Sequence, residues 1–501
     1  MARLRQLIGR ERRACVAWHG LVIAAASFVA FWKIGTPDAA GDERTYVLCG
    51  YRYISGLAAN CNFEHPPLAK EILGVGLHLF GNTLTVGRVT ASLFGLGTAL
   101  FLYLFIRHVT DWRFGLVAAA LWSLTPQAGV ENNVATHALR ISRFALLDPF
   151  LCFFFALALW AGWHLRQRAT REWALVTGAA LVAAALSKEI GLVLAPGIII
   201  LALANPWRRR GVRRTLPLFG WVLVGGAFAA VVAYLPLGWS QSVAEVRYLI
   251  SFQFHHATQG SAGILHGHYY GVVPWWANIW YAFTGMGWIF FSLLAIAIVA
   301  ALVRREMVVA YVLAPTVLIF LVTARSHLTY PFYWVDLEPG LVAAAALGVA
   351  WIWRHRAVRV PAAAALGTLG LLSVGLLVSG VASASPGPYQ RAAHTIDCRR
   401  GCTVDYVGFL GVLENYVTGT VNIARPGGGE FIFQTPGSNV VVPFHSGAQV
   451  RQPEYVVIDP ASPIAKYEFA RSVSEFERRF SQIGYVEVPS GTRMRIWRLV
   501  R

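Results

Sequence analysis

The sequence predicts an integral membrane protein, an all-α bundle of about 11 transmembrane helices with a small C-terminal α/β domain outside the membrane. Composition is the first observation, because 56% of the 501 residues are hydrophobic and only 14% are charged. The apolar residues also gather in runs long enough to cross a bilayer. Finally, the chain changes from Ser385 onward to short β-like runs separated by turns.

Eleven apolar runs of helical length predict the transmembrane helices. They cover residues 16–32, 90–106, 114–130, 150–165, 173–186, 190–203, 216–234, 279–303, 308–322, 337–353 and 362–381. The runs 173–186 and 190–203 are shorter than the roughly 20 residues that a span needs. Only Ser187, Lys188 and Glu189 separate them, so one kinked helix is the alternative to two spans.

The distribution of charge favours two spans. If the pair crossed the membrane once, the arginine cluster at 208–214 would lie opposite the basic N-terminus at 3–13. With eleven spans, both clusters lie on the same side as every other basic short loop. Cytoplasmic loops carry such an excess of Lys and Arg, so we expect a cytoplasmic N-terminus in a multi-pass protein of the cell membrane. Residues 16–32 run on into bulky side chains and predict a retained first span.

This topology defines an outer side. The 43 Lys and Arg lie in small clusters between apolar runs, so their excess over 25 Asp and Glu does not predict nucleic acid as a partner. We expect a transmembrane catalytic domain at 1–384, with its first outer loop at 33–88, and an extracytoplasmic α/β domain at 385–501. The other outer segments are 131–148, 187–189, 239–278 and 324–336.

The C-terminal segment carries the signals of both strands and a helix. The β-like runs FIFQ, NVVVP, YVVID, YVEVP and MRIWRLV are separated by turn sequences such as RPGGGE and TPGSN. Between them, apolar residues recur at helical spacing: Phe469, Val473, Phe476, Phe480 and Ile483. This combination predicts an α/β domain.

Cysteine usage agrees with the outer side. Four of the six cysteines fall there, namely Cys49, Cys61, Cys398 and Cys402. An even number of outer cysteines allows two local disulfides, Cys49–Cys61 and Cys398–Cys402. Four free thiols are the alternative.

The first outer loop begins with two adjacent acids, Asp42 and Glu43, in the stretch GDERTY. A solvated acidic pair is the simplest structural interpretation. The loop continues, however, as CGYRYISGLAANCNFEHPPLAKEILG, and its Pro pair stiffens the backbone where His65 and Lys70 project. So many polar groups beside the bilayer favour a functional site.

A second polar group stands where the next outer loop leads into the fourth span, in HALRISRFALLDPF. Asp148 and Pro149 suit the cap and first turn of a helix, so a structural role explains Asp148 well. It explains less well why Arg140 and Arg143 lie on the same outer boundary as Asp42.

The later outer loops contain further polar side chains: Lys188, His255, His256, His266, His268, Arg325, His327, Tyr330, Tyr333 and Asp336. Together they predict a cavity at the membrane edge with carboxylates, cations and aromatic rings. Histidines at i and i+2 can lie on one side of an extended segment, so a divalent metal is one interpretation of this set. Plain hydrogen-bonding histidines are the interpretation we favour.

Glycosyl transfer from a polyprenyl phosphate needs these groups at this place. The lipid tail stays among the helices while the sugar and phosphate reach the outer surface. A carboxylate can accept the proton of the attacking hydroxyl, and Arg or Lys can stabilise the departing phosphate. A glycosidase pair is excluded for Asp42 and Glu43, because two adjacent carboxylates cannot face one bond from opposite sides.

These residues resemble the protein O-mannosyltransferase family, the dolichyl-phosphate-mannose-protein mannosyltransferases of the glycosyltransferase C superfamily, and its prokaryotic members in particular. That family has an Asp-Glu pair and a His-Pro-Pro followed by Lys in the first outer loop, and an Arg before Leu-Leu-Asp at the fourth span. The matching residues are Asp42, Glu43, His65, Pro66, Pro67, Lys70, Arg143, Leu146, Leu147 and Asp148. The resemblance covers residues 40–165 best.

The resemblance implies the glycosyltransferase C fold, a polyprenyl-phosphate-sugar donor and an inverting transfer, with Asp42 as the base. Glu43 would help shape the acceptor site, and Arg88 and Arg143 are candidate contacts for the anion. The full set of residues expected to contact the donor or substrate is His65, Lys70, Arg88, Arg143, Asp148, Arg325 and His327. The implied partners are the lipid-linked sugar, an acceptor protein or glycan, and membrane lipid, with a divalent metal as the one cofactor considered.

The chain also departs from the eukaryotic members, whose β-trefoil insertion is too large for the outer loop at 239–278. Its C-terminal domain is closer to prokaryotic members, aminoarabinose transferases and oligosaccharyltransferases of the superfamily. We expect transfer of mannose to Ser or Thr of an exported protein, with another sugar and a lipid or cell-wall glycan as the alternative. A non-catalytic transporter or lipid-binding protein is the competing class, but the two halves of the chain do not resemble each other.

Overall fold

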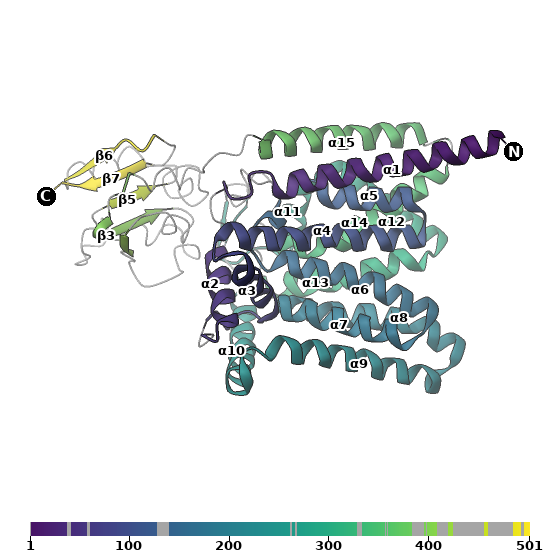
Figure 1. Cartoon of the computed structure of the whole chain (residues 1–501), viewed down its shortest axis with the longest axis horizontal. Coiled ribbons are helices and arrows are strands. Elements are labelled where there is room, and N and C mark those ends of the chain that lie inside the picture. Colours follow the sequence, from purple (N-terminus) through teal and green to yellow (C-terminus); the bar gives the residue numbers. More distant parts are fainter. Residues whose placement is uncertain are drawn as a thin grey trace.

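The computed structural model describes residues 2–37, 42–57, 61–127, 140–260, 263–265, 268–327, 333–355, 357, 359–382, 395–396, 398–407, 419–423, 455–458, 484–491 and 495–500. Long helices lie side by side in one bundle, and the strands lie beyond one end of it (Figure 1). The N-terminus lies at the opposite end (Figure 1).

Every predicted apolar run coincides with a helix. The helices that match the runs are α1 (Ala2–Phe31), α4 (Leu84–Val109), α5 (Trp112–Leu124), α6 (Asp148–Arg168), α7 (Arg171–Ser187), α8 (Leu194–Arg210), α9 (Val212–Tyr234), α12 (Trp288–Arg304), α13 (Met307–Ser326), α14 (Glu338–Arg354) and α15 (Arg359–Ala382). The predicted helical bundle is therefore confirmed.

Not all of these helices are long and apolar enough to cross a membrane alone. In the described part of the chain, 7 helical segments pass that test, or 8 with one bent pair. They are Arg13–Phe31, Leu84–Val109, Asp148–Arg168, Glu189–Arg210, Val212–Tyr234, Met307–Ser326 and Tyr333–Arg354. Helix α5 is apolar but short. The protein is thus a multi-span membrane protein, and the predicted count of eleven exceeds the segments that qualify by themselves.

The predicted span at 279–303 is not one continuous helix. The run is divided between α11 (Ala277–Met286) and α12, which are bent by 114° relative to each other. The bend occurs at Gly287, whose φ of +83° is readily adopted only by glycine. An apolar run that contains a glycine hinge reads as one helix in a hydropathy window, so the sequence did not indicate this break.

The short runs at 173–186 and 190–203 form two helices, as the charge pattern predicted. Helix α7 ends at Ser187, and a 3₁₀ turn, η3 (Glu189–Val193), follows before α8 begins. A Cβ atom at Gly191 would lie only 2.5 Å from the carbonyl carbon of Ala184. The chain therefore folds back on the last turn of α7 and does not continue it.

Three further helices lie at the end of the bundle nearest the strands, which we call the site end (Figure 1). They are α2 (Glu43–Ile54), α3 (Leu68–Phe80) and α10 (Gly238–Gln259). The short 3₁₀ helices η2 (Ile141–Arg143) and η4 (Tyr333–Leu337) and the hairpin of β1 (Gly263–Leu265) and β2 (His268–Tyr270) connect helices that meet there. The opposite end, with the N-terminus and the basic loops, we call the basic end.

The strands of the C-terminal segment form one five-stranded sheet in the order β4-β3-β5-β7-β6. Strand β3 (Cys398–Val407) pairs in parallel with β4 (Gly419–Ile423) and β5 (Tyr455–Ile458). Strand β7 (Arg495–Leu499) pairs antiparallel with β5 and with β6 (Tyr485–Val488). Parallel neighbours require crossover connections, as in an α/β domain.

Three of the five predicted β-like runs, YVVID, YVEVP and MRIWRLV, correspond to β5, β6 and β7. The runs FIFQ and NVVVP and the helix expected at 469–483 lie outside the described residues. Strands β3 and β4 were missed, because the polar and charged residues of CRRGCTVDYV and GTVNI hide the pattern. The division of the chain at 384/385 stays a prediction.

Helices α2 and α3 cross at a pair of glycines. A Cβ atom at Gly50 would lie 2.3 Å from the Lys70 carbonyl oxygen, and one at Gly74 would lie 2.1 Å from the Gly50 carbonyl oxygen. Both contacts are with backbone, which cannot move aside as a flexible side chain can. The two helices of the first outer loop are therefore in backbone contact.

We expect Gly74→Ala to destabilise the protein by about 1–3 kcal/mol, because the added methyl group has no space between the helices. Thermal unfolding of the detergent-solubilised protein measures this effect. Gly20→Ala is the matched control, since Gly20 is also helical and nothing lies within 4 Å of its Cβ position. Equal melting temperatures for the two variants would contradict the close crossing of α2 and α3.

Candidate active site

The adjacent acids Asp42 and Glu43 point into different surroundings. Asp42 immediately precedes α2 and is exposed, with one carboxylate oxygen 3.4 Å from the donating hydroxyl of Tyr46. Glu43 opens the helix and is completely buried. Because the two carboxylates diverge, Asp42 is accessible to a substrate and Glu43 is not.

Glu43 forms a bidentate ion pair with Arg88 of α4. The Arg88 Nε and Nη2 atoms each donate to one Glu43 oxygen at 2.8 Å, and both side chains are buried. Glu43 also accepts a hydrogen bond of 2.7 Å from the backbone N–H of Ala145. One carboxylate thus joins the first outer loop to α4 and to the segment before α6.

Arg88 was expected to contact an anionic substrate, and the geometry argues against this. Its remaining terminal nitrogen, Nη1, donates to the carbonyl oxygens of Ile34 and Pro37 at 3.1 and 2.9 Å. All three nitrogens of the guanidinium therefore have protein partners. In this structure Arg88 therefore holds the loop after α1, and its contact with an anion stays a prediction.

Arg143 also faces the protein. Its Nη1 and Nη2 atoms donate to the carbonyl oxygens of Val29 and Trp32, at the end of α1, the second at 2.7 Å. Burial, and then the charge of Arg88, lower the pKa of Arg143 to about 10. Only Nε lacks a partner among the described residues. Cations favour helix C-termini, so these contacts stabilise the end of α1, and the expected contact of Arg143 with an anion stays a prediction.

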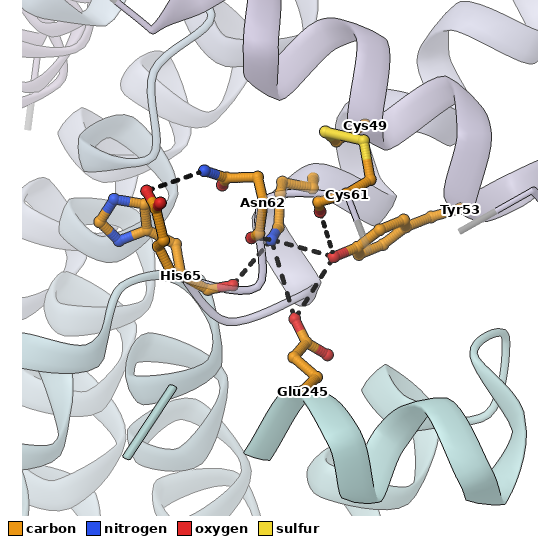
Figure 2. Close-up of a disulfide and its surroundings, with 8 residues drawn as sticks. Cys49, Tyr53, Cys61, Asn62, His65 and Glu245 are labelled. Atoms are coloured by element: carbon orange, nitrogen blue, oxygen red, sulfur yellow. Dashed lines mark hydrogen bonds and ion pairs between the residues drawn. A yellow bond between two sulfur atoms is a disulfide. The ribbon is translucent and has the colours of Figure 1, made fainter. Parts of the chain in front are cut away.

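Lys70 anchors the loop that a disulfide closes. Cys49 and Cys61 form a disulfide with a Cα–Cα distance of 5.4 Å, which confirms one of the two disulfides considered. The Lys70 ammonium donates to the carbonyl oxygens of Asn62 and His65, at 2.6 and 2.7 Å. Figure 2 shows these loop residues gathered beside the disulfide. The side chains of Cys398 and Cys402 lie outside the described part of the structure.

The third hydrogen of Lys70 is directed to the hydroxyl of Tyr53, at 3.1 Å. The single O–H of Tyr53 has two acceptors within reach, the Cys61 carbonyl oxygen at 2.8 Å and the Glu245 carboxylate of α10 at 3.4 Å (Figure 2). The same Glu245 carboxylate lies 3.8 Å from the Lys70 ammonium. An ammonium has three donors, so all three hydrogens of Lys70 have protein acceptors in this structure, and its expected contact with the donor or substrate stays a prediction. Sequence reasoning missed Glu245, because a single acid in an outer helix gives no signal.

Tyr46 lies close to three of the predicted site residues, Asp42, His65 and Asp148. Its ring lies edge-on to that of His65, with centroids 5.8 Å apart. Burial, and then the nearby Asp42 charge, raise the pKa of Tyr46 well above its usual value, with Asp148 and Glu189 also contributing. The structure thus brings Asp42, His65 and Asp148 around one phenol.

Two consecutive residues, Lys188 and Glu189, connect His65 and Asp148 to further segments of the chain. The His65 Nδ1 atom lies 3.0 Å from a carboxylate oxygen of Glu189, at the start of η3. Lys188 pairs with Asp148 at 2.8 Å and with Asp336 at 2.7 Å. The signal for Lys188 and Glu189 was their position between two apolar runs, where charged residues need a reason.

The last two predicted residues lie at the end of α13. Arg325 is exposed and makes no hydrogen bond or ion pair with the residues that the structure describes. His327 caps α13 in the left-handed region, with φ of +52°, and its Nδ1 atom donates to the Val273 carbonyl at 2.8 Å. Arg325 is therefore available to a ligand, whereas His327 joins α13 to the segment before α11.

The described residues contain no group of three or more His, Cys, Asp or Glu side chains that could hold a metal ion. His255 and His256 lie in α10 and His268 in β2, so the first two are not on an extended segment. His266 lies outside the described residues.

We expect Glu43→Ala to destabilise the protein by about 3–5 kcal/mol, because it leaves Arg88 buried without its partner. The matched control is Glu172→Ala, which removes an exposed glutamate that pairs with Arg171 at 3.0 Å and should leave the melting temperature unchanged. Thermal unfolding in detergent compares the two. A Glu43→Ala protein as stable as the control would contradict the central position of the buried pair.

Glu71 of α3 should make stability depend on pH. Burial, and then the charge of Glu245, raise the pKa of Glu71 to about 8, and one Glu71 oxygen has no partner among the described residues. A raised pKa in the folded state gives stability that is full below the unfolded pKa, about 4.3, and lost as the pH rises through the folded one. Glu71→Gln should therefore match the native melting temperature near pH 5 and exceed it above about pH 8. Melting temperatures of Glu71→Gln and the native protein that change in parallel with pH would contradict this. Glu172→Gln is the control, and its melting temperature should follow that of the native protein at every pH.

With the fold and geometry established, two comparisons with known proteins, one with protein families and one with solved structures, point to the same class. Residues 64–235, about a third of the chain, match the family described as dolichyl-phosphate-mannose-protein mannosyltransferase. Comparison with curated protein sequences gives no match.

Two solved structures share the fold over nearly the whole chain. ArnT from Cupriavidus metallidurans bound to undecaprenyl phosphate has a TM-score of 0.60 and 17% identity, covering 96% of this chain and 98% of that one. The Archaeoglobus fulgidus oligosaccharyltransferase tethered with an acceptor peptide has a TM-score of 0.52 and 13% identity, covering 95% and 73%. The chain therefore has the fold of these glycosyltransferases, and the expected resemblance to the dolichyl-phosphate-mannose-protein mannosyltransferase family is confirmed in residues 64–235.

Proposed function

We propose that this protein is a membrane glycosyltransferase that moves a sugar from a polyprenyl phosphate to an acceptor hydroxyl at the site end of the bundle. The observation that carries the proposal is the exposed Asp42 carboxylate, beside Tyr46 and next to a glutamate that is locked in the fold. The similarity to ArnT and to the archaeal oligosaccharyltransferase supports a lipid-linked donor.

In this mechanism Asp42 accepts the proton of the attacking hydroxyl. The hydroxyl oxygen forms a bond to the anomeric carbon of the sugar as the bond from that carbon to the phosphate oxygen breaks. The transfer inverts the anomeric carbon, because the acceptor attacks opposite the departing phosphate. Asp42 is suited to this role since its carboxylate is exposed and, among the residues that the structure describes, is oriented by a 3.4 Å contact with Tyr46.

The departing phosphate needs positive charge. Lys70, Arg88 and Arg143 direct their donors at the protein itself. Of the cations expected to bind the donor, Arg325 is the one whose side chain is exposed without a partner among the described residues. We therefore assign Arg325 to the phosphate, where a guanidinium can bind two oxygens at once.

Mannose is the proposed sugar and a Ser or Thr hydroxyl of an exported protein the proposed acceptor. The match of residues 64–235 to the mannosyltransferase family supports both. The fold of ArnT matches this chain with a higher TM-score than that of the archaeal oligosaccharyltransferase, 0.60 against 0.52. This similarity favours a second candidate function, the transfer of another sugar to a lipid or cell-wall glycan. The two candidates share the role of Asp42 and differ in the acceptor.

We place the basic end in the cytoplasm and the site end, with the C-terminal strands, outside it. The excess of Lys and Arg at the basic end supports this orientation. The Cys49–Cys61 disulfide at the site end supports it independently, because disulfides persist in oxidising compartments. The C-terminal domain, at 385–501, would then share a compartment with the acceptor.

We expect Asp42→Asn to reduce transfer by about 10²–10⁴-fold, because the amide cannot accept the proton. The assay uses membranes with the protein, radiolabelled polyprenyl-phosphate mannose and a Ser/Thr-rich peptide. Asp111→Asn, at the basic end, is the matched control, since Asp111 only caps α5 through the Arg113 N–H at 2.7 Å.

Undiminished transfer by a folded Asp42→Asn protein would overturn the role of Asp42. Transfer by neither protein calls for the same test with aminoarabinose and other lipid-linked sugars and with glycan acceptors. Failure of that whole panel would overturn the proposed function.

A further inference from the structure

Lys188 lies between two buried carboxylates that come from distant parts of the chain. Its ammonium is 2.8 Å from Asp148 at the start of α6 and 2.7 Å from Asp336 in η4. The three side chains are 6%, 4% and 3% exposed. The Tyr333 ring covers the ammonium with its centroid 4.3 Å away. The point where the two carboxylates converge is therefore occupied and enclosed.

Two carboxylates that converge in this way make a place for a cation. A divalent ion bound there would need the same oxygens that Lys188 holds, because Mg²⁺, Zn²⁺ and Ca²⁺ bind carboxylate oxygen at about 2.0–2.6 Å. One further oxygen, Asp336 Oδ1, has no partner among the described residues. The two oxygens that face each other across the space, Asp148 Oδ1 and Asp336 Oδ2, are both held by the Lys188 ammonium, so a divalent ion could bind there only by displacing it. The donor set fits an ammonium and does not fit a divalent metal.

We propose that Lys188 is the resident cation of the site, in the position that a divalent metal would otherwise take between Asp148 and Asp336, so that transfer proceeds without a metal. This proposal rests on the proposed function. Lys188 acts through the two carboxylates as a positioning residue. It neutralises one of their two charges beside Tyr46, and so limits the repulsion that an incoming anionic donor would meet.

The exchange of cations can be tested because removing Lys188 should create the metal site. Lys188→Ala leaves two buried carboxylates facing a vacated space, and such a pair binds either a proton or a cation. Lys188→Met removes the charge but fills the space. The alanine variant should therefore acquire a response to divalent ions that the methionine variant lacks.

The experiment measures transfer by the full-length protein after dialysis against EDTA, with and without added Mg²⁺ or Mn²⁺. The native protein should keep its activity within about twofold under all conditions. Lys188→Ala should lose about tenfold or more, and Mn²⁺ or Mg²⁺ should restore part of the loss. Lys188→Met should show a similar loss, and neither ion should restore its activity. Lys33→Ala is the matched control, since Lys33 is an exposed lysine that donates to the Ala382 carbonyl.

A second measurement separates this proposal from the proposed function. Electron paramagnetic resonance of free Mn²⁺ should detect one bound ion for Lys188→Ala and none for the native protein in detergent. The proposal would be overturned if EDTA abolished the activity of the native protein and Mg²⁺ restored it. It would also be overturned if the native protein bound Mn²⁺ at this site, or if neither the native protein nor Lys188→Ala bound Mn²⁺. If neither the native protein nor any variant transfers a sugar, the proposed function fails. The Mn²⁺ binding measurement then still tests whether Lys188 occupies the cation position. If Lys188→Ala does not fold, the native protein's response to EDTA and Mn²⁺ decides alone.

Discussion

The buried pair of Glu43 and Arg88 is the interaction on which the site depends. It joins the start of α2, the first turns of α4 and the backbone N–H of Ala145, three segments that the chain keeps far apart in sequence. A bidentate pair of this kind fixes orientation as well as distance. Because Asp42 is the neighbour of Glu43, locking Glu43 also fixes where the accessible carboxylate stands. A charge without a partner at this depth would be costly, so the pair can hold the loop only while it is complete.

The cost of a buried charge without a partner also explains why so many of the expected substrate contacts have protein partners. Lys70 uses its three hydrogens on the disulfide loop and Tyr53, and Arg143 uses two nitrogens on the end of α1. These cations hold in place the loop that presents Asp42 and His65. Their positions near the acids, which suggested anion binding, are equally what a loop needs when it packs polar backbone against a membrane boundary.

Much of the fold could be predicted from the sequence, because hydropathy and the distribution of arginines depend on residues that are neighbours along the chain. Each apolar run is a helix, and the separate α7 and α8 follow from charge alone. What could not be read depends on the third dimension. Gly287 breaks one run, the buried Glu245 of α10 lies 3.8 Å from Lys70 of α3, and Lys188 bridges Asp148 to Asp336. The motif residues Asp42, His65 and Asp148 do meet, but periodicity could not reveal that Arg88 and Lys70 serve the scaffold.

The stereochemistry of transfer tests the central claim most directly, namely that Asp42 acts alone as a base in a single displacement. Nuclear magnetic resonance of the product would give the configuration of its anomeric carbon, compared with that of the lipid-linked donor. The account predicts inversion, because Glu43 is held on both oxygens by Arg88 and cannot turn to attack the sugar. Retention of configuration would require a carboxylate that forms a covalent bond to the sugar, and it would contradict the account.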